Sequence, residues 1–157
     1  MTEIIPAAAA LNEMGIAHQT FTHSNQIKSI EQAAAERNQN VDQVIRSIVF
    51  RISEGEYAMV LIAGKSQISW KALRQHFGTS RLTMASPDEV LAATGYKIGT
   101  VSPFGIKKPL PILADENIYY PPAVSLGSGV SGTAILMRAE DFKRALGEIE
   151  IGRFAIR

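Results

Sequence analysis

Two apolar runs joined by a short turn lie in the stretch IRSIVFRISEGEYAMVLIA, residues 45–63. The first run is rich in β-branched residues, which favour the pleated surface of a sheet. Glu54-Gly55-Glu56 separates the runs, and a short segment with glycine is typical of a hairpin loop. We therefore predict two antiparallel strands, over 45–52 and 57–63, at the centre of the fold.

Helices and further strands are predicted on both sides of this hairpin. Pro6 and Gly15 bracket a run of good helix formers, as a first-turn proline and a C-terminal stop would. Capping patterns that begin at Ser29 and Ser86 predict the starts of two more helices. We also expect helices over 69–77 and 139–146, a helical turn over 40–43, and strands over 16–22, 81–84, 110–114, 123–126, 133–137 and 149–156.

The order of these elements predicts one mixed α/β domain. Several neighbouring strands are joined too tightly for parallel crossovers, so the sheet should be mixed. A chain of 157 residues is long enough to bury a core, and we expect a single domain over 1–157.

The composition excludes several classes of protein. The chain has no Cys, which excludes a disulfide scaffold, a thiolate metal site and a Cys nucleophile. Its 46% hydrophobic content and net charge of +1 argue against wholesale disorder. No apolar run approaches the roughly 20 residues that a membrane helix needs, so we expect a cytoplasmic protein without a membrane partner.

The cations are distributed unevenly. Between Gly64 and Ala114, seven Lys and Arg residues face only Asp88 and Glu89, so this segment carries +5 and the rest of the chain −4. A basic block is a candidate footprint for a polyanion such as nucleic acid. An ordinary solvated face is the alternative, and composition alone favours it.

Several common kinds of site lack support. Gly127, Gly129 and Gly132 have the spacing of a dinucleotide fingerprint, but a strand rather than a helix should follow them. A ligand-facing loop and a plain turn are comparable interpretations of these glycines. The three His have no partners at metal-ligand spacing, so we expect no metal and no cofactor. Neither Gly-x-Ser-x-Gly nor Ser-x-x-Lys occurs, so a hydrolase would lack an obvious protein nucleophile.

The loop over 99–105, Gly-Thr-Val-Ser-Pro-Phe-Gly, is the most unusual segment. Its glycines permit close backbone approach, and proline fixes one φ between them. Such a loop can present N–H donors to a carbonyl or phosphate, although a structural turn is the simpler interpretation. Lys107 and Lys108 follow directly and would contact phosphates or water.

These motifs occur in an order that resembles the YbaK family, also described as prolyl-tRNA synthetase-associated or INS-like editing domains. The resemblance runs from about residue 6 to 147 and rests on FTH at 21–23, VIRSIVF at 44–50, ASPDE at 85–89, TGYKIGTVSPFG at 94–105, PLPILAD at 109–115 and VSLG at 124–127. The Gly-x-x-x-Pro loop from Gly99 to Pro103, preceded by Thr-Gly-Tyr, is the most specific element.

The resemblance implies a mixed α/β fold around a curved, barrel-like sheet, with surrounding helices. It implies hydrolysis of the ester between a misattached amino acid and the 3′-terminal ribose of tRNA. Because 157 residues leave no room for a synthetase, we expect a freestanding protein that acts in trans on the acceptor end, with a synthetase as a second candidate partner. The amino acid should be small, because a pocket excludes bulky side chains best. The alternatives are an inactive binder of tRNA or a synthetase, and a hydrolase of another small ester or thioester.

The resemblance also assigns site residues. The family's functional lysine falls at Arg46, which we expect to act with Gly99 and Ser102 of the loop as the catalytic group. The expected substrate-binding residues are Phe21, His23, Pro103, Ser125 and Gly127, and Lys107 and Lys108 are expected to bind tRNA. An acid of the best-known member has no match, its nearest counterpart being Ala134.

Arg46 is the main departure from the family pattern. A lysine ammonium can shift its pKa and act as a base, whereas a guanidinium stays charged. Arg46 would therefore bind and orient the acyl end or the terminal nucleotide, unless the protein is an inactive binder. A ribose hydroxyl of the terminal adenosine would then help to position or activate water.

Overall fold

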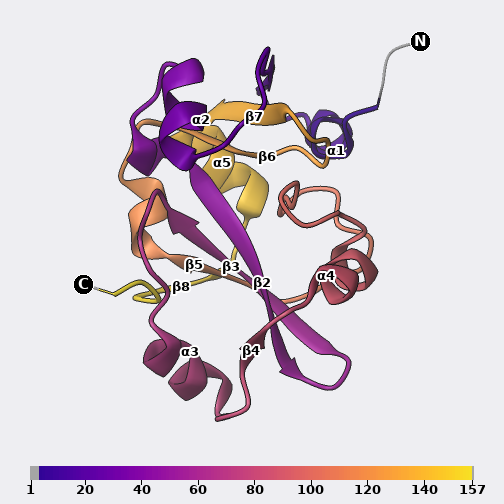
Figure 1. Cartoon of the computed structure of the whole chain (residues 1–157), viewed down its shortest axis with the longest axis vertical. Coiled ribbons are helices and arrows are strands. Elements are labelled where there is room, and N and C mark those ends of the chain that lie inside the picture. The colour runs from indigo at the N-terminus through magenta and orange to yellow at the C-terminus, as the bar shows by residue number, and fades with distance from the viewer. Residues whose placement is uncertain (1–3, 157) are drawn as a thin grey trace.

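The computed structural model describes residues 4–156, so residues 1–3 and 157 of the predicted domain lie outside the described part. The elements along the chain are α1 (Pro6–Met14), β1 (Gln19–Thr22), α2 (Ile30–Glu36), the 3₁₀ turn η1 (Val41–Gln43), β2 (Ile45–Ser53), β3 (Glu56–Ala63), α3 (Trp70–Phe77), β4 (Thr83–Met84), α4 (Pro87–Thr94), β5 (Ile112–Asp115), the 3₁₀ turn η2 (Glu116–Tyr119), β6 (Ala123–Gly127), β7 (Thr133–Arg138), α5 (Ala139–Leu146) and β8 (Glu150–Gly152) (Figure 1).

The strands form two open sheets. The larger has the order β4-β2-β3-β5-β8, and the smaller has the order β1-β7-β6. β2 pairs antiparallel with β3, while β3 with β5 and β5 with β8 are parallel. The predicted hairpin and the mixed α/β fold are confirmed, and the expected curved sheet takes the form of two sheets rather than one.

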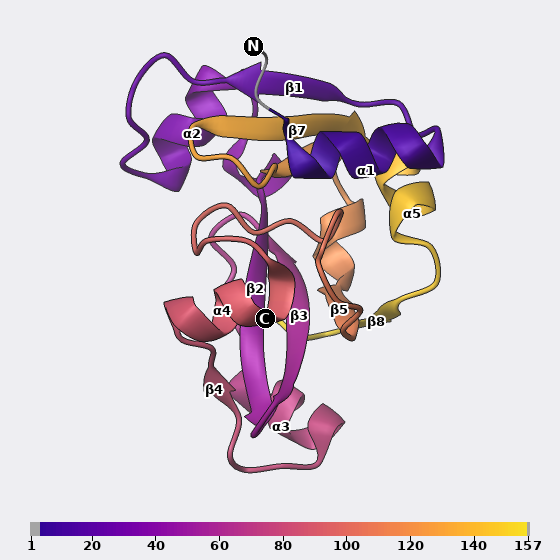
Figure 2. The ribbon, with the colours of Figure 1, turned by 90° about the vertical axis from the view of Figure 1, so that its right-hand side faces the viewer.

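The two sheets meet at the start of β2. Val44 forms an isolated parallel bridge with Ser125 of β6, and the next residue, Ile45, already pairs with Ala63 of β3. Gly64 N–H donates to the Val44 carbonyl at 2.8 Å. Figure 2 shows β2 and β3 running up to the smaller sheet, which lies across their upper end. Residues from both sheets therefore come together at this junction.

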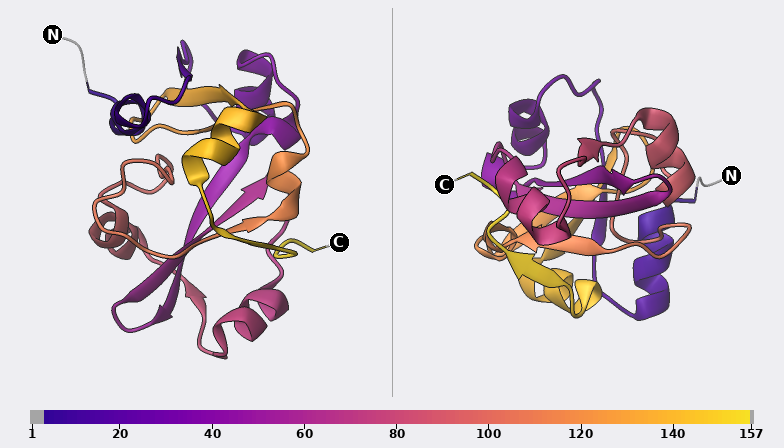
Figure 3. Two further views of the ribbon diagram at one scale, coloured as in Figure 1. Left: turned by 180° about the vertical axis from the view of Figure 1, so that it is seen from behind. Right: turned by 90° about the horizontal axis from the view of Figure 1, so that it is seen from below.

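β3 is buried on both faces, which explains its unbroken apolar sequence. Met59 and Leu61 point into the larger core, together with Leu11 of α1 and Phe142 of α5. The alternate residues Val60 and Ile62 belong to a second core, which also contains Phe50, Leu73 and Phe154. Figure 3 shows α5 packed beneath the smaller sheet and α3 at the opposite end of the molecule. Each fully buried side chain of this size contributes about 1.5–3 kcal/mol.

Local signals place most helix ends correctly. Ser86 caps α4 in a capping box with Glu89, Pro87 occupies the first turn, and Gly95 ends the helix in the left-handed region. The strand expected over 149–156 is shorter and ends at Gly152. Beyond it, the buried Asp115 carboxylate accepts the N–H groups of Phe154 and Ala155 at 2.8 and 2.9 Å, and Ala155 forms an isolated antiparallel bridge with Ile68.

Tyr96 fixes the chain before and after the Gly99–Pro103 loop. Its side chain is buried, and its hydroxyl donates to the Phe104 carbonyl. A side chain at either of two nearby glycines, Gly105 or Gly129, would clash with Tyr96. A Cβ at Gly129 would be 2.6 Å from the ring, and one at Gly105 would be 2.6 Å from the hydroxyl. The Thr94-Gly-Tyr96 motif therefore fixes the conformation of the loop through the contacts of the Tyr96 side chain.

Because of Tyr96, the free energy of unfolding should fall as the pH becomes alkaline. Burial raises the pKa of Tyr96 from 10.0 to about 12 because the folded protein favours the neutral phenol. Its contribution is complete below the unfolded pKa of about 10 and is lost as the pH rises towards about 12. We expect urea unfolding to show a loss on the order of 1 kcal/mol between about pH 8 and about pH 11.

The matched variants are Tyr96→Phe and Tyr120→Phe, since Tyr120 is exposed. Tyr96→Phe should be less stable at neutral pH, because the Phe104 carbonyl loses its donor, but its alkaline loss should shrink. A Tyr96→Phe protein with the alkaline dependence of the wild type would contradict this assignment.

Candidate functional site

A cavity of about 320 Å³ opens at the junction of the two sheets. Its walls are the beginning of β2, the residue after α2, two residues of the loop before Pro103 and the end of β6. Three predicted site residues line it, namely Arg46, Gly99 and Gly127. Ser47 also lines it, and the Ser47 hydroxyl is buried without a hydrogen-bond partner among the described residues. A buried polar atom of this kind favours a bound water or ligand.

Arg46 is tied to the backbone that follows β3. Its Nε donates to the Gly64 carbonyl at 2.7 Å, and its Nη2 donates to the Ser66 carbonyl. A lysine has one nitrogen and cannot reproduce this planar two-point contact. Burial lowers the pKa of Arg46, although a guanidinium remains charged at neutral pH. Arg46 is thus a cation held in a fixed orientation at the cavity wall.

The Gly99–Pro103 loop is locked against the end of β6. A Cβ at Gly127 would lie 2.1 Å from the Val101 carbonyl oxygen, so only glycine permits this approach. Gly129 N–H donates to the Thr100 carbonyl at 2.9 Å. Gly99 itself has a φ of 88°, a conformation that favours glycine. The loop therefore borders the cavity with its backbone, at Gly99 and Val101.

Two other predicted loop residues lie inside the loop. The Ser102 side chain is completely buried, and its hydroxyl accepts the Phe104 N–H at 3.2 Å. Pro103 is also buried. Neither is among the residues that line the cavity. The geometry gives the Ser102 side chain a part in shaping the loop, while any donor to a ligand would come from the loop backbone.

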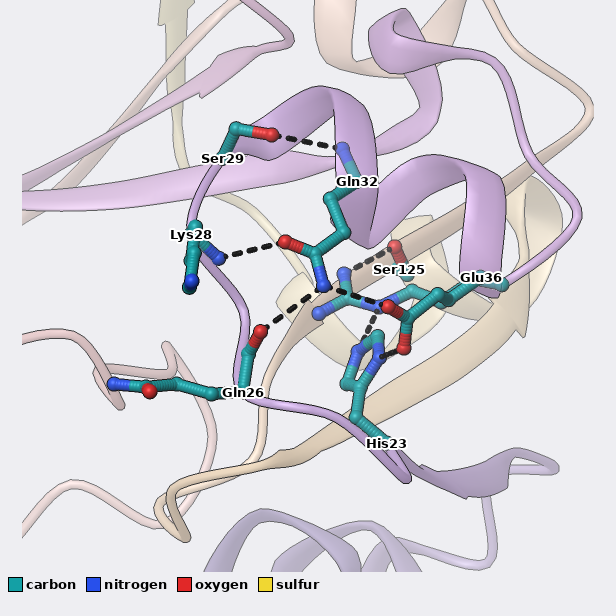
Figure 4. Close-up of polar contacts among 8 residues, drawn as sticks. His23, Gln26, Lys28, Ser29, Gln32, Glu36 and Ser125 are labelled. Carbon is teal, nitrogen blue, oxygen red and sulfur yellow. Dashed lines mark hydrogen bonds and ion pairs between the residues drawn. The ribbon is translucent and has the colours of Figure 1, made fainter.

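A chain of hydrogen bonds joins β1, α2 and β6 beside the cavity (Figure 4). His23 Nδ1 lies 2.8 Å from Glu36 Oε1. Arg37 Nε donates to His23 Nε2 at 3.0 Å, and Arg37 Nη1 donates to Ser125 Oγ at 3.0 Å. Because His23 Nε2 accepts a hydrogen bond, the ring proton is assigned to Nδ1, which donates to Glu36.

The Glu36 carboxylate is bound at both oxygens. His23 contacts Oε1, and Gln32 Nε2 donates to Oε2 at 2.8 Å. The hydrogen bonds from His23 and then Gln32 are the main causes that lower the pKa of Glu36, so it remains ionised under mildly acid conditions. Gln32 is itself fixed by the Gln26 carbonyl at 3.0 Å, as Figure 4 shows.

Two predicted substrate-binding residues, His23 and Ser125, contact Arg37, and a third, Phe21, contacts His23. Phe21 packs edge-on against His23 with ring centroids 4.9 Å apart, and Ser125 is completely buried. Sequence reasoning missed Arg37, because a charged residue after a helix normally indicates solvent exposure. Its partner Ser125 lies 88 positions away, so no local pattern could reveal the contact.

The structure leaves other predicted residues outside the cavity. Lys107 N–H donates to the Thr94 carbonyl, and Lys108 lines a separate cavity near the β2–β3 turn. Lys65 of the basic block forms an ion pair with Glu31 at 3.2 Å. Ala134, the nearest counterpart of the acid in the best-known family member, is buried opposite Phe21 in the β1–β7 pair.

Within residues 4–156, no group of three His, Cys, Asp or Glu residues is placed to hold a metal ion. No helix in that same range is long and apolar enough to cross a membrane.

Known proteins resemble this chain in sequence. Residues 24–145 match the family model described as "Aminoacyl-tRNA editing domain". The proline–tRNA ligase of Pseudothermotoga lettingae is 33% identical over 105 residues, which cover 67% of this chain and 18% of the ligase. That of Pelobacter propionicus is 31% identical over 110 residues, covering 70% of this chain and 19% of the ligase. The chain thus spans less than a fifth of each of these relatives.

Solved structures share the fold. A crystal structure assigned provisionally to a trans-editing enzyme for prolyl-tRNA synthetase has a TM-score of 0.86 and 24% identity, and covers 99% of this chain and 100% of that one. The structure of a hypothetical protein, APE2540, has a TM-score of 0.84 and 16% identity, over 95% of this chain and 98% of that one. These likenesses establish the fold alone.

The close approach at Gly127 gives a testable consequence. Gly127→Ala would place a methyl group against the Val101 carbonyl and should destabilise the protein by about 2 kcal/mol or more, measured by urea unfolding. Gly152→Ala is a suitable control, because the nearest atoms to its Cβ would belong to the Phe154 side chain, from 3.0 Å, and not to backbone. Equal and small effects of the two substitutions would show that the loop is not locked by Gly127.

Proposed function

Because the chain belongs to the aminoacyl-tRNA editing domain family, we propose that it hydrolyses the ester of tRNA that carries a wrong, small amino acid. The proposed deacylase is freestanding, acts in trans in the cytoplasm and takes the acceptor end of aminoacyl-tRNA as its partner. The observation that carries the proposal is the cavity at the sheet junction, where two arginines and the Gly99 loop surround one space. Its volume of about 320 Å³ suits a small acyl group.

The residues of the cavity support a water-based reaction. Arg46 anchors the substrate at the acyl end or terminal nucleotide. Backbone amides of the loop from Gly99 to Ser102 polarise the ester carbonyl, with Gly99 and Val101 at the cavity wall, whereas the Thr100 N–H already donates to the Lys97 carbonyl at 3.0 Å. Water adds to the carbonyl carbon, the bond to the ribose oxygen breaks, and that oxygen leaves with a proton. A neighbouring ribose hydroxyl positions the water. This route fits a chain that has no Cys and no recognisable nucleophile motif.

An adjoining cavity provides space for the end of the RNA. It measures about 720 Å³ and shares Arg46 and Ile48 with the 320 Å³ cavity at the sheet junction, which we call the acyl cavity. Trp70, Lys65 and Gln67 also line it, and aromatic and cationic side chains together suit unpaired nucleotides. Lys107 and Lys108, both exposed, are then proposed contacts to the acceptor stem outside the two cavities.

A second candidate function is binding of tRNA or a synthetase without catalysis. The Arg46 geometry favours it, since this residue stands where the family resemblance implies a lysine, and two of its donors bind protein carbonyls. A binder would retain affinity for charged tRNA and leave the ester intact.

Deacylation of a panel of mischarged tRNAs tests the function. We expect the wild type to release at least one amino acid faster than buffer does. The deacylation rate of Arg46→Ala should be lower than that of the wild type by roughly 10²-fold or more, the loss expected when one donor that stabilises an oxyanion is removed. The rate of Arg46→Lys should lie between those of the wild type and Arg46→Ala. Arg81→Ala, an exposed residue away from the cavity, should match the wild type.

Two outcomes would change the account. If no tRNA in the panel loses its ester above the buffer rate, the deacylase proposal is wrong, and binding of charged tRNA would then favour the second candidate. If the wild type is active and Arg46→Ala is equally active while folded, Arg46 does not anchor the substrate.

A further inference from the structure

Arg37 has hydrogen-bonding capacity beyond what the protein uses. A guanidinium carries five N–H donors. Two are engaged, one by His23 and one by Ser125, and within residues 4–156 Nη2 donates no hydrogen bond. Arg37 also lines the acyl cavity together with Gly127 and Thr133. The remaining donors are therefore available at the wall of a space that the protein leaves open.

The orientation of Arg37 is fixed before any ligand arrives. His23 holds Nε from one side and is itself held by Glu36, whose carboxylate is also bound by Gln32. Ser125 holds Nη1 from the other side and is completely buried on β6. Such a preorganised donor loses little conformational entropy when it binds a ligand.

The charge of Arg37 is only indirectly balanced. Among the described residues no carboxylate lies within ion-pair distance of its guanidinium, because Glu36 directs its oxygens to His23 and Gln32. The side chain is half-buried, so water solvates it only in part. A partly desolvated cation with free donors favours a ligand that presents an oxygen acceptor.

Arg37 also stands in the part of the site where an amino-acid side chain is expected. His23 and Ser125 contact Arg37 directly, and Phe21 packs against His23. The family resemblance implies that all three bind substrate. The Ser125 hydroxyl already accepts a hydrogen bond from Arg37, and Arg37 rather than Ser125 lines the cavity. A ligand that enters the cavity would therefore contact Arg37.

We propose that Arg37 is a specificity-determining residue, which selects misattached amino acids whose small side chain carries an oxygen over apolar side chains of the same size. This inference rests on the proposed deacylase function and names its substrate class. The side-chain oxygen accepts an N–H of Arg37, whereas an apolar isostere buries that N–H without a partner. Sites built to hydrogen-bond a hydroxyl discriminate strongly against analogues that lack it.

The sharpest test compares threonine and valine, which differ by a hydroxyl in place of a methyl group, as esters of one tRNA. The wild type should hydrolyse the threonyl ester about 10- to 100-fold faster than the valyl ester, the range expected for one hydrogen bond to a charged group. In Arg37→Met, which keeps an unbranched apolar stem, the ratio should fall towards one because threonine loses its donor.

Two variants separate selection from a structural role. Arg81→Met, at an exposed position outside the cavity, should keep the wild-type ratio. Ser125→Ala retains the cation but removes one of its anchors, so the ratio should fall only in part. A purely structural Arg37 would lower both rates together and leave the ratio unchanged. Circular dichroism checks that each variant folds. If Arg37→Met does not fold, the proposal is tested by the threonyl-to-valyl rate ratio of the wild type and of Ser125→Ala.

The outcomes distinguish this inference from the proposed function. A wild type that hydrolyses neither these esters nor any other in the panel overturns the deacylase function, and the inference with it. An active wild type that hydrolyses threonyl and valyl esters at equal rates overturns the inference alone. An unchanged ratio in folded Arg37→Met likewise shows that another residue makes the selection.

Discussion

The bridge between Val44 and Ser125 is the contact on which the site depends. It joins the smaller sheet to the first residue before β2, which immediately afterwards enters the larger sheet through Ile45 and Ala63. One strand thereby aligns Arg46 with the residues of β6, and Gly127 is held against the Gly99–Pro103 loop within the same few residues. Both sheets and the Gly99–Pro103 loop together form the walls of the cavity.

Cations and backbone groups dominate the chemistry available there. The two arginines are held differently: Arg46 by carbonyls that follow β3, and Arg37 by side chains of β6 and of the segment after β1. Neither is a base, so in the proposed reaction the protein supplies fixed positive charge and water is the nucleophile. This division agrees with a chain that lacks Cys and with its membership of the aminoacyl-tRNA editing domain family.

Local sequence signals predicted the elements well where they are physically strong. The capping box at Ser86, the stop at Gly95 and the hairpin over β2 and β3 appear as expected. The motif order identified the family correctly. What local patterns could not supply is long-range contact. Arg37 meets Ser125 across 88 positions of the sequence, and the Asp115 carboxylate accepts N–H groups of the segment that follows β8, about 40 positions later. The expected strand ends early because Asp115 accepts the N–H groups of Phe154 and Ala155, and beyond it, among the described residues, only an isolated bridge between Ala155 and Ile68 forms.

In the proposed function, this cavity removes an amino acid from tRNA with its two fixed cations. The most direct measurement is the rate of ester loss from mischarged tRNA with the wild type and with the double variant Arg37→Met, Arg46→Ala, in parallel with buffer. The account predicts turnover by the wild type and a rate at the buffer level for the folded double variant. A wild type no faster than buffer, or a double variant as fast as the wild type, would contradict it.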